Sequence, residues 1–235
     1  MATQFAASSL DLLRGGEITV KGRMPWSSNA TFLVELTRDG TLGHAVYKPG
    51  RGERPLWDFP PALYRREIAA YLLSEALGWG LVPLTIEREG PFGDGSLQSF
   101  VPADFDQHYF TLKEDVAHHD RLRQICVFDL LANNADRKSG HCLICESGIY
   151  AIDNGLTFHV QSKLRTVIWD FGGEPIPGPL LDDVRRVVDG PLPDALSALL
   201  SGDEREALLA RGRTLLESGV FPVDHSGMRY PWPLV

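Results

Sequence analysis

The stretch from Asp129 to Gly155, DLLANNADRKSGHCLICESGIYAIDNG, decides the fold that we expect for the chain. It holds two carboxylates, Asp136 and Asp153, each set among polar, turn-forming residues. Apolar positions before Asp136 recur at helical spacing, and the runs HCLIC and GIYAI predict a hairpin of two short strands. We therefore expect Asp136 on a loop between a helix and a strand, and Asp153 at the exit of the next strand.

Two carboxylates at such positions suit a division of labour. One can handle a substrate proton while the other holds a divalent cation. Phosphoryl transfer needs this division, because most of its catalysis is positioning and charge neutralisation. For either residue alone, an ordinary turn residue is the favoured interpretation, since Asp is common in turns. The two in this order, together with the partner residues described below, favour a phosphotransferase.

These residues also carry a resemblance. NNADRKSGHCLI followed by YAIDNGLTF resembles the catalytic loop and metal-binding segment of the phosphatidylinositol 3-/4-kinase superfamily. The pattern is most similar to type II phosphatidylinositol 4-kinases, whose loop has the form N-T-D-R-x-x-D-N-W-L followed by A-I-D-N-G-L, and to an actinobacterial group related to them. The resemblance implies that Asp136 is catalytic, that Asp153 binds metal, and that Arg137 and Lys138 neutralise the transferring group or position the loop.

The fold that we expect is α+β and bilobal, like that of protein kinases. Residues 1–101 would form an N-lobe with a five-stranded antiparallel sheet and one main helix. Residues 102–235 would form a reduced, mostly helical C-lobe, with the nucleotide bound between the lobes. The last helices are expected at residues 181–188, 193–200 and 203–217, followed by an irregular tail that its Trp-Pro and Tyr-Pro elements pin to the body.

Composition sets outer bounds on function. The 235 residues suffice for one large domain or one domain of two lobes. Lys and Arg number 23 against 31 Asp and Glu, a net charge of −8 that disfavours nucleic acid and anionic membrane surfaces as partners. No apolar run approaches the roughly 20 residues of a transmembrane segment. The first residues lack a secretory pattern and the three cysteines are odd in number, so we expect a reduced, cytoplasmic protein.

The predicted N-lobe begins with strands at residues 17–22, 30–37 and 43–48. Between the first two lies a polar loop with Ser27, Ser28 and Asn29. In a kinase-like lobe such a loop closes over nucleotide phosphates through backbone N–H groups and small side chains. A plain polar hairpin loop explains the same residues.

Lys48 ends the third strand in AVYKPG, which resembles the A-V-F-K-P of the type II lipid kinases. The following segment, PALYRREIAAYLLSEALG, is the clearest helical pattern in the chain, and Glu67 lies at the edge of its apolar stripe. A carboxylate there is costly to bury unless it is paired. We therefore predict an ion pair in which Glu67 holds Lys48 against nucleotide phosphates, the alternative being a solvated Glu67.

Two more strands are expected at residues 81–87 and 95–101. The second resembles the segment that ends in the kinase hinge, where backbone groups hold adenine. Phe100 and Val101 are the hinge candidates.

His141 departs from the family pattern, which has an asparagine that binds metal at this position. An imidazole suits manganese or zinc better than magnesium, so His141 is a second metal-ligand candidate beside Asp153. A zinc site with Cys142 and Cys145 is rejected, because positions three apart on a strand face opposite sides. Lys163 and Arg165 are the basic residues that lie close together where lipid kinases read the head group, and a solvated loop explains them equally well.

The function that we expect is transfer of the γ-phosphate of ATP, with Mg²⁺ or Mn²⁺, to a hydroxyl of a lipid, protein or small molecule. Two alternatives stay open. His141 would fit a nucleotide-binding pseudokinase that acts through a partner, and the same scaffold could transfer AMP instead of phosphate.

Overall fold

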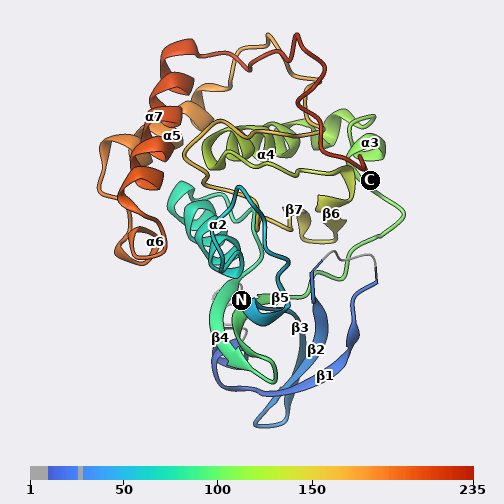
Figure 1. Ribbon diagram of the computed structural model, residues 1–235. Coiled ribbons are helices and arrows are strands. Elements are labelled where there is room, and N and C mark those ends of the chain that lie inside the picture. Colours follow the sequence, from blue (N-terminus) through green and yellow to red (C-terminus); the bar gives the residue numbers. More distant parts are fainter. Residues whose placement is uncertain (1–9, 26–28) are drawn as a thin grey trace. The chain divides into compact units, whose positions relative to one another are not determined.

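The computed structural model describes residues 10–25 and 29–235 (Figure 1). The chain divides into two compact units. Unit one comprises the described residues up to Ile68 together with Pro83–Val101, and unit two comprises Ala69–Val82 together with Pro102–Val235. The chain thus passes from one unit to the other three times, after Ile68 (within the helix Tyr64–Leu77), after Val82 and after Val101.

Unit one is built on a five-stranded antiparallel sheet, as expected. Its strands in spatial order are β1 (Glu17–Arg23), β2 (Phe32–Arg38), β3 (Thr41–Pro49), β5 (Gly93–Ser99) and β4 (Thr85–Gly90). Alternate residues of the middle strands face the core, among them Val34, Leu36 and Tyr47. Both turn residues between β2 and β3, Asp39 and Gly40, have positive φ (48° and 77°), which the tight hairpin requires.

Helix α2 (Tyr64–Leu77) follows a proline-rich loop and the short η1 (Gly50–Gly52). The carboxylate of Glu53 accepts hydrogen bonds from the backbone N–H groups of Leu63 (2.9 Å) and Tyr64 (2.7 Å), which satisfies donors that a helix start leaves unpaired. Gly78, with φ +74°, ends the helix as its sequence position predicts.

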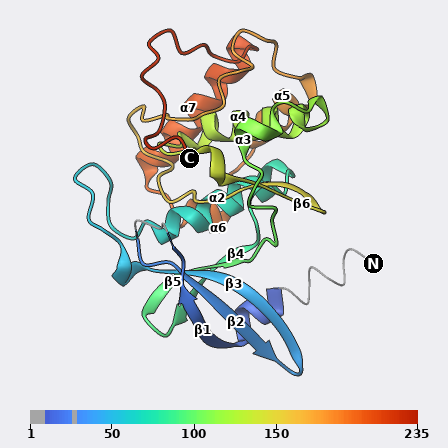
Figure 2. The same cartoon turned by 90° about the vertical axis from the view of Figure 1, so that its right-hand side faces the viewer.

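Unit two contains the remaining elements, which Figures 1 and 2 show as helices and one small hairpin. In chain order they are α3 (Tyr109–Leu112), η2 (Val116–His118), α4 (His119–Ala132), η3 (Ser139–His141), β6 (Cys142–Cys145), β7 (Gly148–Ala151), α5 (Gly178–Asp189), α6 (Asp194–Ser197) and α7 (Gly202–Ser218). The expected hairpin and the three late helices are present.

Where α4, α5 and α7 meet, the helices approach closely at Gly212 of α7. A side chain there would meet Val188 of α5 at 2.4 Å and Leu131 of α4 at 3.5 Å. The core of unit two also includes Leu73 and Leu77 from the second part of α2. Apolar side chains from segments far apart in the sequence therefore form one core.

Two expectations about local structure are wrong. Strand β4 begins at Thr85 and not at Leu81, because Leu81 and Val82 belong to the core of unit two, where Ser74 Oγ accepts their N–H groups (2.7 and 3.2 Å). The ring of Trp232 does not pin the tail, since it is 87% exposed, whereas Pro231 of the Tyr-Pro element is buried. Backbone hydrogen bonds hold the tail instead, including Ser139 N–H to the carbonyl of Leu234 (2.8 Å).

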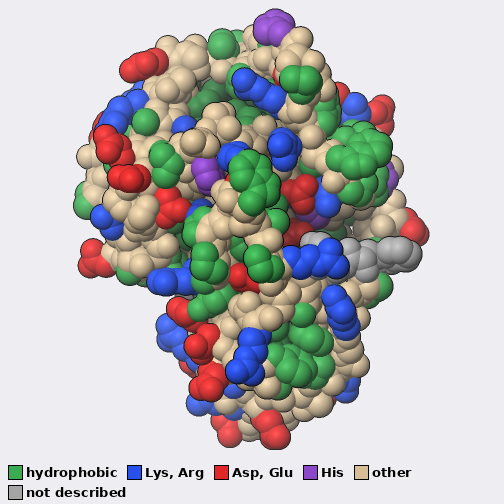
Figure 3. Space-filling view, in the orientation of Figure 1, with side chains coloured by type: hydrophobic (Ala, Val, Ile, Leu, Met, Phe, Trp, Pro, Cys, Tyr) green, Lys and Arg blue, Asp and Glu red, His purple; other side chains and the backbone are tan. Residues whose placement is uncertain are grey.

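Within residues 10–25 and 29–235, the structure has no helix that is both long and apolar enough to span a membrane. On the face drawn in Figure 3, acidic and basic side chains are interspersed, and neither sign forms a continuous field.

Candidate active site

The end of α4 delivers the loop that carries Asp136. Asn133 adopts a left-handed conformation (φ 53°) and its N–H bonds to the carbonyl of Asp129, which ends the helix. The N–H of Asn134 bonds to the same carbonyl at 3.0 Å, and the side-chain oxygen of Asn134 accepts the N–H of Asp136 at 3.0 Å. Asp136 therefore lies on a loop between a helix and a strand, as predicted.

A buried ion pair between Arg137 and Asp129 holds the loop that carries Asp136. The guanidinium of Arg137 donates to both carboxylate oxygens of Asp129 (2.9–3.1 Å), and neither side chain has exposed surface. Further bonds run from Arg137 to the carbonyl of Ile152 (2.6 Å) and to Asn154 Oδ1 (2.7 Å). Burial disfavours the charge of Arg137, but the charge and hydrogen bonds of Asp129, together with Cys142 and Asp153, outweigh this effect, so the pKa of Arg137 is raised. Of the two roles expected for Arg137, this geometry supports positioning the loop.

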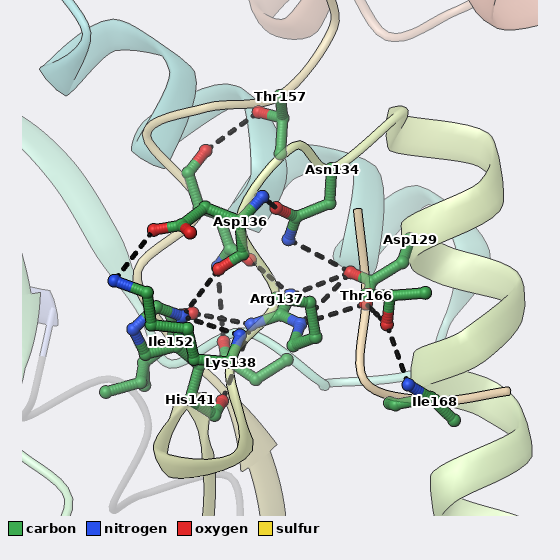
Figure 4. Close-up of polar contacts among 12 residues, drawn as sticks. Asp129, Asn134, Asp136, Arg137, Lys138, His141, Ile152, Thr157, Thr166 and Ile168 are labelled. Atoms are coloured by element: carbon green, nitrogen blue, oxygen red, sulfur yellow. Dashed lines mark hydrogen bonds and ion pairs between the residues drawn. The ribbon is translucent and has the colours of Figure 1, made fainter. Parts of the chain in front are cut away.

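Asp129 is the centre of this network, as Figure 4 shows. Besides Arg137, its carboxylate accepts Asn134 Nδ2 (3.0 Å) and Thr166 Oγ1 (3.4 Å). Asn134 in turn fixes the backbone of Asp136. A carboxylate that accepts this many hydrogen bonds is stable without water. The loop is thus tied to α4 at several points.

Asp136 itself is partly exposed, with 26% of its side chain accessible, and Lys138 Nζ lies 3.3 Å from its carboxylate. Burial raises the pKa of Asp136 to about 6. Lys138 opposes this shift and the nearby charge of Asp153 adds to it. A carboxyl group with such a pKa is mostly ionised at neutral pH and is a better proton acceptor than an ordinary aspartate.

Asp153 follows β7, as predicted, and lies in a left-handed conformation with φ 55°. Its side chain is 51% exposed, whereas the next residue, Asn154, is buried and bonds to Arg137. The same arginine thus ties the Asp136 loop to the turn that presents Asp153. Non-glycine residues with positive φ are uncommon and cluster at functional sites.

His141 lies against Asp153. The two potential ligand atoms, His141 Nε2 and Asp153 Oδ2, are 3.3 Å apart. Ligands at right angles around one cation, with bonds of about 2.1 Å, are roughly 3 Å apart, so this pair fits a divalent cation. Within the part of the chain that the structure describes, no group of three or more His, Cys, Asp or Glu residues could hold a metal. Cys142 is buried while Cys145 is partly exposed, in keeping with the rejection of a zinc site.

In unit one, the structure brings Lys48 and Glu67 together. Lys48 Nζ, at the end of β3, donates a hydrogen bond to Glu67 Oε1 in the first turn of α2. The side chain of Glu67 is 3% exposed and that of Lys48 is 21% exposed. The apolar stripe of α2 therefore buries the carboxylate, and the lysine supplies the opposite charge that burial requires.

The remaining nucleotide-binding candidates are the polar loop after β1 and the expected hinge. Ser27 and Ser28 lie outside the described residues. Asn29 braces the loop after β3, since its Oδ1 accepts the N–H of Arg54 at 3.0 Å. In the expected hinge, the N–H of Phe100 bonds to the carbonyl of His44 at 3.1 Å and thus continues the sheet, while Val101 is buried and ends unit one. The Phe100 N–H therefore already has a hydrogen-bond acceptor within the protein.

Sequence reasoning missed the residues that hold the loop, namely Asp129, Asn134, Asn154 and Thr166. One signal was present for Asp129. It lies four positions after Ile125 and three after Cys126, on the apolar stripe of α4, where a carboxylate needs a buried partner. The position of that partner in the sequence could not be read from the stripe.

Comparison with known proteins gives the family. No protein-family model matches the chain. The alignment with Protein Rv2133c of Mycobacterium tuberculosis spans 260 residues at 43% identity. It covers 94% of this chain and 94% of Rv2133c. The chain belongs to the family of Rv2133c.

Two solved structures resemble this member of the Rv2133c family in fold alone. The structure of hydra Fam20 with sugar matches with a TM-score of 0.51 at 15% identity, covering 89% of this chain and 87% of that one. The Helicobacter pylori proinflammatory kinase CtkA matches with a TM-score of 0.49 at 15% identity, covering 89% and 94%. The Fam20 match shows a shared fold, and the five-stranded antiparallel sheet together with the helices of unit two confirms the expected α+β fold class.

Proposed function

We propose that the protein is an ATP-dependent phosphotransferase with a hydroxyl group as acceptor. The proposal rests on two carboxylates of unit two, Asp136 and Asp153, whose loops are held together by the hydrogen bonds of Arg137. Asp136 is partly buried with a pKa of about 6, whereas Asp153 is half exposed beside a second potential metal ligand. Two carboxylates with separate environments can take the separate roles of proton acceptor and metal ligand.

Each remaining side chain has a role in this proposal. Asp136 would orient the acceptor hydroxyl and take its proton, and Lys138, 3.3 Å away, would place positive charge near the transferring group. Lys48, held by Glu67, would contact phosphate oxygens of the nucleotide. A divalent cation held by Asp153 would neutralise phosphate charge. Arg137 would position the loop and make no contact with substrate.

The acceptor is the finer part of the proposal. The likeness of the two loop motifs to those of type II phosphatidylinositol 4-kinases favours phosphatidylinositol as the first lipid to test. Lys163 and Arg165, which lie where lipid kinases read the head group, give little support for a polyanionic inositol phosphate, because they are only two basic residues and a solvated loop explains them equally well. Protein and small-molecule hydroxyls stay in the proposal.

The test uses purified full-length protein with ATP labelled at the α- or the γ-phosphate and with Mg²⁺ or Mn²⁺. Acceptors are presented as phosphatidylinositol vesicles, as a protein extract and as a metabolite extract. We expect γ-label transfer by the wild type, none by Asp136→Ala, and full transfer by Asp182→Asn, a matched loss of charge on the exposed surface of α5. Transfer of α-label would identify an AMP transferase. Nucleotide binding without transfer of either label would identify a pseudokinase.

A further inference from the structure

The tail that follows α7, residues 219–235, lies against the loop that follows α4. The N–H of Ser139 in that loop donates to the carbonyl of Leu234 at 2.8 Å. A second backbone bond joins the N–H of Thr166 to the carbonyl of Arg229 at 3.0 Å. The tail therefore contacts two segments of the candidate active site, although it lies far from both in the sequence.

Thr166 connects the tail to the residue that directly follows Asp136. It forms a parallel bridge with Arg137, in which Arg137 N–H donates to the carbonyl of Arg165 (3.0 Å) and Val167 N–H donates to the carbonyl of Arg137 (3.1 Å). Figure 4 shows Thr166 beside Arg137. One residue, Thr166, therefore lies between the tail and the backbone next to Asp136.

The carboxylate of Asp224 fixes the part of the tail that contacts Thr166. Its Oδ1 accepts the N–H (3.0 Å) and the hydroxyl (2.6 Å) of Ser226, and its Oδ2 accepts the N–H of Arg229 (3.0 Å). Gly227, with φ +64°, allows the chain to turn between these two residues. The bond to Arg229 N–H restrains the same residue whose carbonyl accepts Thr166 N–H, so the direction of that carbonyl depends on Asp224.

The two ends of the tail are held independently of Asp224. Phe221 is 1% exposed, and its N–H donates to the carbonyl of Glu174 at 2.9 Å. Leu234 packs against the core of unit two. Loss of the Asp224 carboxylate should therefore change the turn around Arg229 and leave both ends of the tail attached.

We propose that Asp224 is a positioning residue for phosphoryl transfer, which holds the loop that carries Asp136 by way of the Arg229 carbonyl and Thr166. In this role it acts through other residues and not on the substrate itself. The proposal rests on the phosphotransferase function. A displacement of about 1 Å at the reacting atoms can cost about 10²-fold in rate, so even a small shift of this loop should lower kcat. KM for ATP should change little, because Lys48 of unit one is proposed to contact the phosphates.

The alternative is that Asp224 shapes only its own surface turn. Aspartate side chains commonly bond to the backbone two residues on, and they do so in turns with no link to a site. Under that alternative, replacing Asp224 changes neither the loop that carries Asp136 nor the rate. Overall stability does not separate the two interpretations, because a surface substitution changes it little in either case. The behaviour of the loop does.

The experiment compares Asp224→Ala with the wild type by amide hydrogen exchange and by steady-state transfer of γ-label from ATP. Exchange at residues 136–141 should become at least about threefold faster. kcat should fall about tenfold while KM for ATP stays within about twofold. The melting temperature should stay within about 2 °C of the wild type. Asp224→Asn keeps one oxygen that can accept a hydrogen bond and should recover part of the rate.

Two further variants make the test specific. Asp115→Ala is the matched control, because Asp115 also accepts a backbone N–H two residues on, from Ala117 at 2.9 Å, and it should behave as the wild type. Trp169→Phe tests the same contact from outside the tail, since Trp169 Nε1 donates to the carbonyl of Arg229 at 3.3 Å. It should change exchange and kcat in the same direction as Asp224→Ala, by a smaller amount.

The outcomes separate this proposal from the function on which it rests. A wild-type kcat in Asp224→Ala, unchanged exchange at residues 136–141, or an equal loss of rate in Asp115→Ala overturns the positioning role. If Asp224→Ala fails to fold, Asp224→Asn and Trp169→Phe decide the question by the same two measurements. If the wild type transfers no label, the proposed function fails, and hydrogen exchange alone decides whether Asp224 holds the loop.

Discussion

At the scale of single residues, Asp136 combines a partly buried carboxylate with a backbone fixed by its neighbours. Its pKa of about 6 lies above the value of roughly 3.9 that an aspartate has in an unfolded chain. The folded protein therefore holds this proton more tightly than the unfolded chain. The resulting contribution to stability is complete below about pH 4 and is lost as the pH rises through about 6, so the charged carboxylate costs stability at neutral pH.

Replacing Asp136 with Asn should therefore raise the free energy of unfolding at pH 7.5 while removing activity. Two pKa units correspond to about 3 kcal/mol, and partial exposure reduces the expected gain to about 1–2 kcal/mol. Urea unfolding at pH 7.5 and at pH 4 measures it, and the gain should disappear at pH 4. Glu206→Gln, on the exposed side of α7, should show no such gain. A loss of stability at pH 7.5 in Asp136→Asn would contradict the raised pKa.

The same group should set the acid limb of the pH–rate profile. If Asp136 accepts the acceptor's proton, kcat should fall about tenfold per pH unit below about pH 6, because the protonated acid cannot act as a base. Steady-state rates between pH 5 and 8 at saturating nucleotide test this expectation. A rate that stays constant from pH 7 to pH 5 would remove Asp136 from the role of base.

At the scale of secondary-structure elements, one ion pair joins a strand to a helix in unit one. Glu67 is nearly fully buried in the first turn of α2, and Lys48 at the end of β3 neutralises it. Removing one member of a buried pair leaves an uncompensated charge, whereas removing both does not. The connection between β3 and α2 thus depends on both residues.

A double-mutant cycle tests this coupling. Lys48→Met should lower the free energy of unfolding by about 2–4 kcal/mol, because the buried Glu67 carboxylate then lacks the positive charge of Lys48. Glu67→Gln should cost less, since Lys48 is partly exposed, and the double variant should lose less than the sum of the two. Nucleotide affinity, measured by calorimetry, should fall in every variant that lacks Lys48. Additive losses of stability would show that the two side chains do not interact in solution.

Helix α7 depends on a residue with no side chain. Gly212 allows α7 to approach α5 and α4, and an added Cβ would meet Val188 at 2.4 Å. Gly212→Ala should therefore destabilise the protein by about 1–3 kcal/mol, even though alanine favours a helix by about 1 kcal/mol over glycine. Thermal unfolding measures the change. The control is Gly202→Ala at the exposed start of the same helix, and a higher melting temperature for Gly212→Ala would show that the helices can separate at no cost.

At the scale of the whole molecule, the two compact units are not two consecutive pieces of sequence. Residues 69–82 belong to unit two, and Leu73, Leu77 and Leu81 are fully or almost fully buried in its core. Ser74 and Trp79 add buried or partly buried hydrogen bonds, from Leu81 N–H to Ser74 Oγ (2.7 Å) and from Trp79 Nε1 to Asp183 (2.8 Å). A division of the chain at residue 101 therefore separates unit two from part of its core.

A chain beginning at Pro102 should accordingly fail to fold cooperatively, because several buried leucine side chains, each stabilising by about 1.5–3 kcal/mol, are missing from its core. Near-ultraviolet circular dichroism and thermal unfolding, compared with the full chain, measure this. Adding the peptide of residues 69–82 in excess should restore part of the signal, whereas a peptide with Leu73→Asp and Leu77→Asp should not. Cooperative unfolding of the shorter chain by itself would contradict the assignment of residues 69–82 to unit two.

Local pattern alone was enough for much of the structure. Alternation placed most strands of the sheet, Gly78 marked the end of α2, and the turns carrying Asp136 and Asp153 were found from their flanking apolar runs. Period-two and period-3.6 patterns arise because side chains must face a core on one side of an element. These patterns therefore predict whether an element is a helix or a strand, and the residues at which it ends.

What only the tertiary structure decided is which segments share a core and which polar groups meet inside it. The stripe of α4 shows that Asp129 is buried, but only the fold brings Arg137, Asn134 and Thr166 to it. Likewise, the run that starts at Leu81 has strand-like composition, yet packing in unit two takes its first residues away from β4. Periodicity records that a side chain is buried and contains no information about its partner, because the partner is fixed by contacts between segments far apart in the chain.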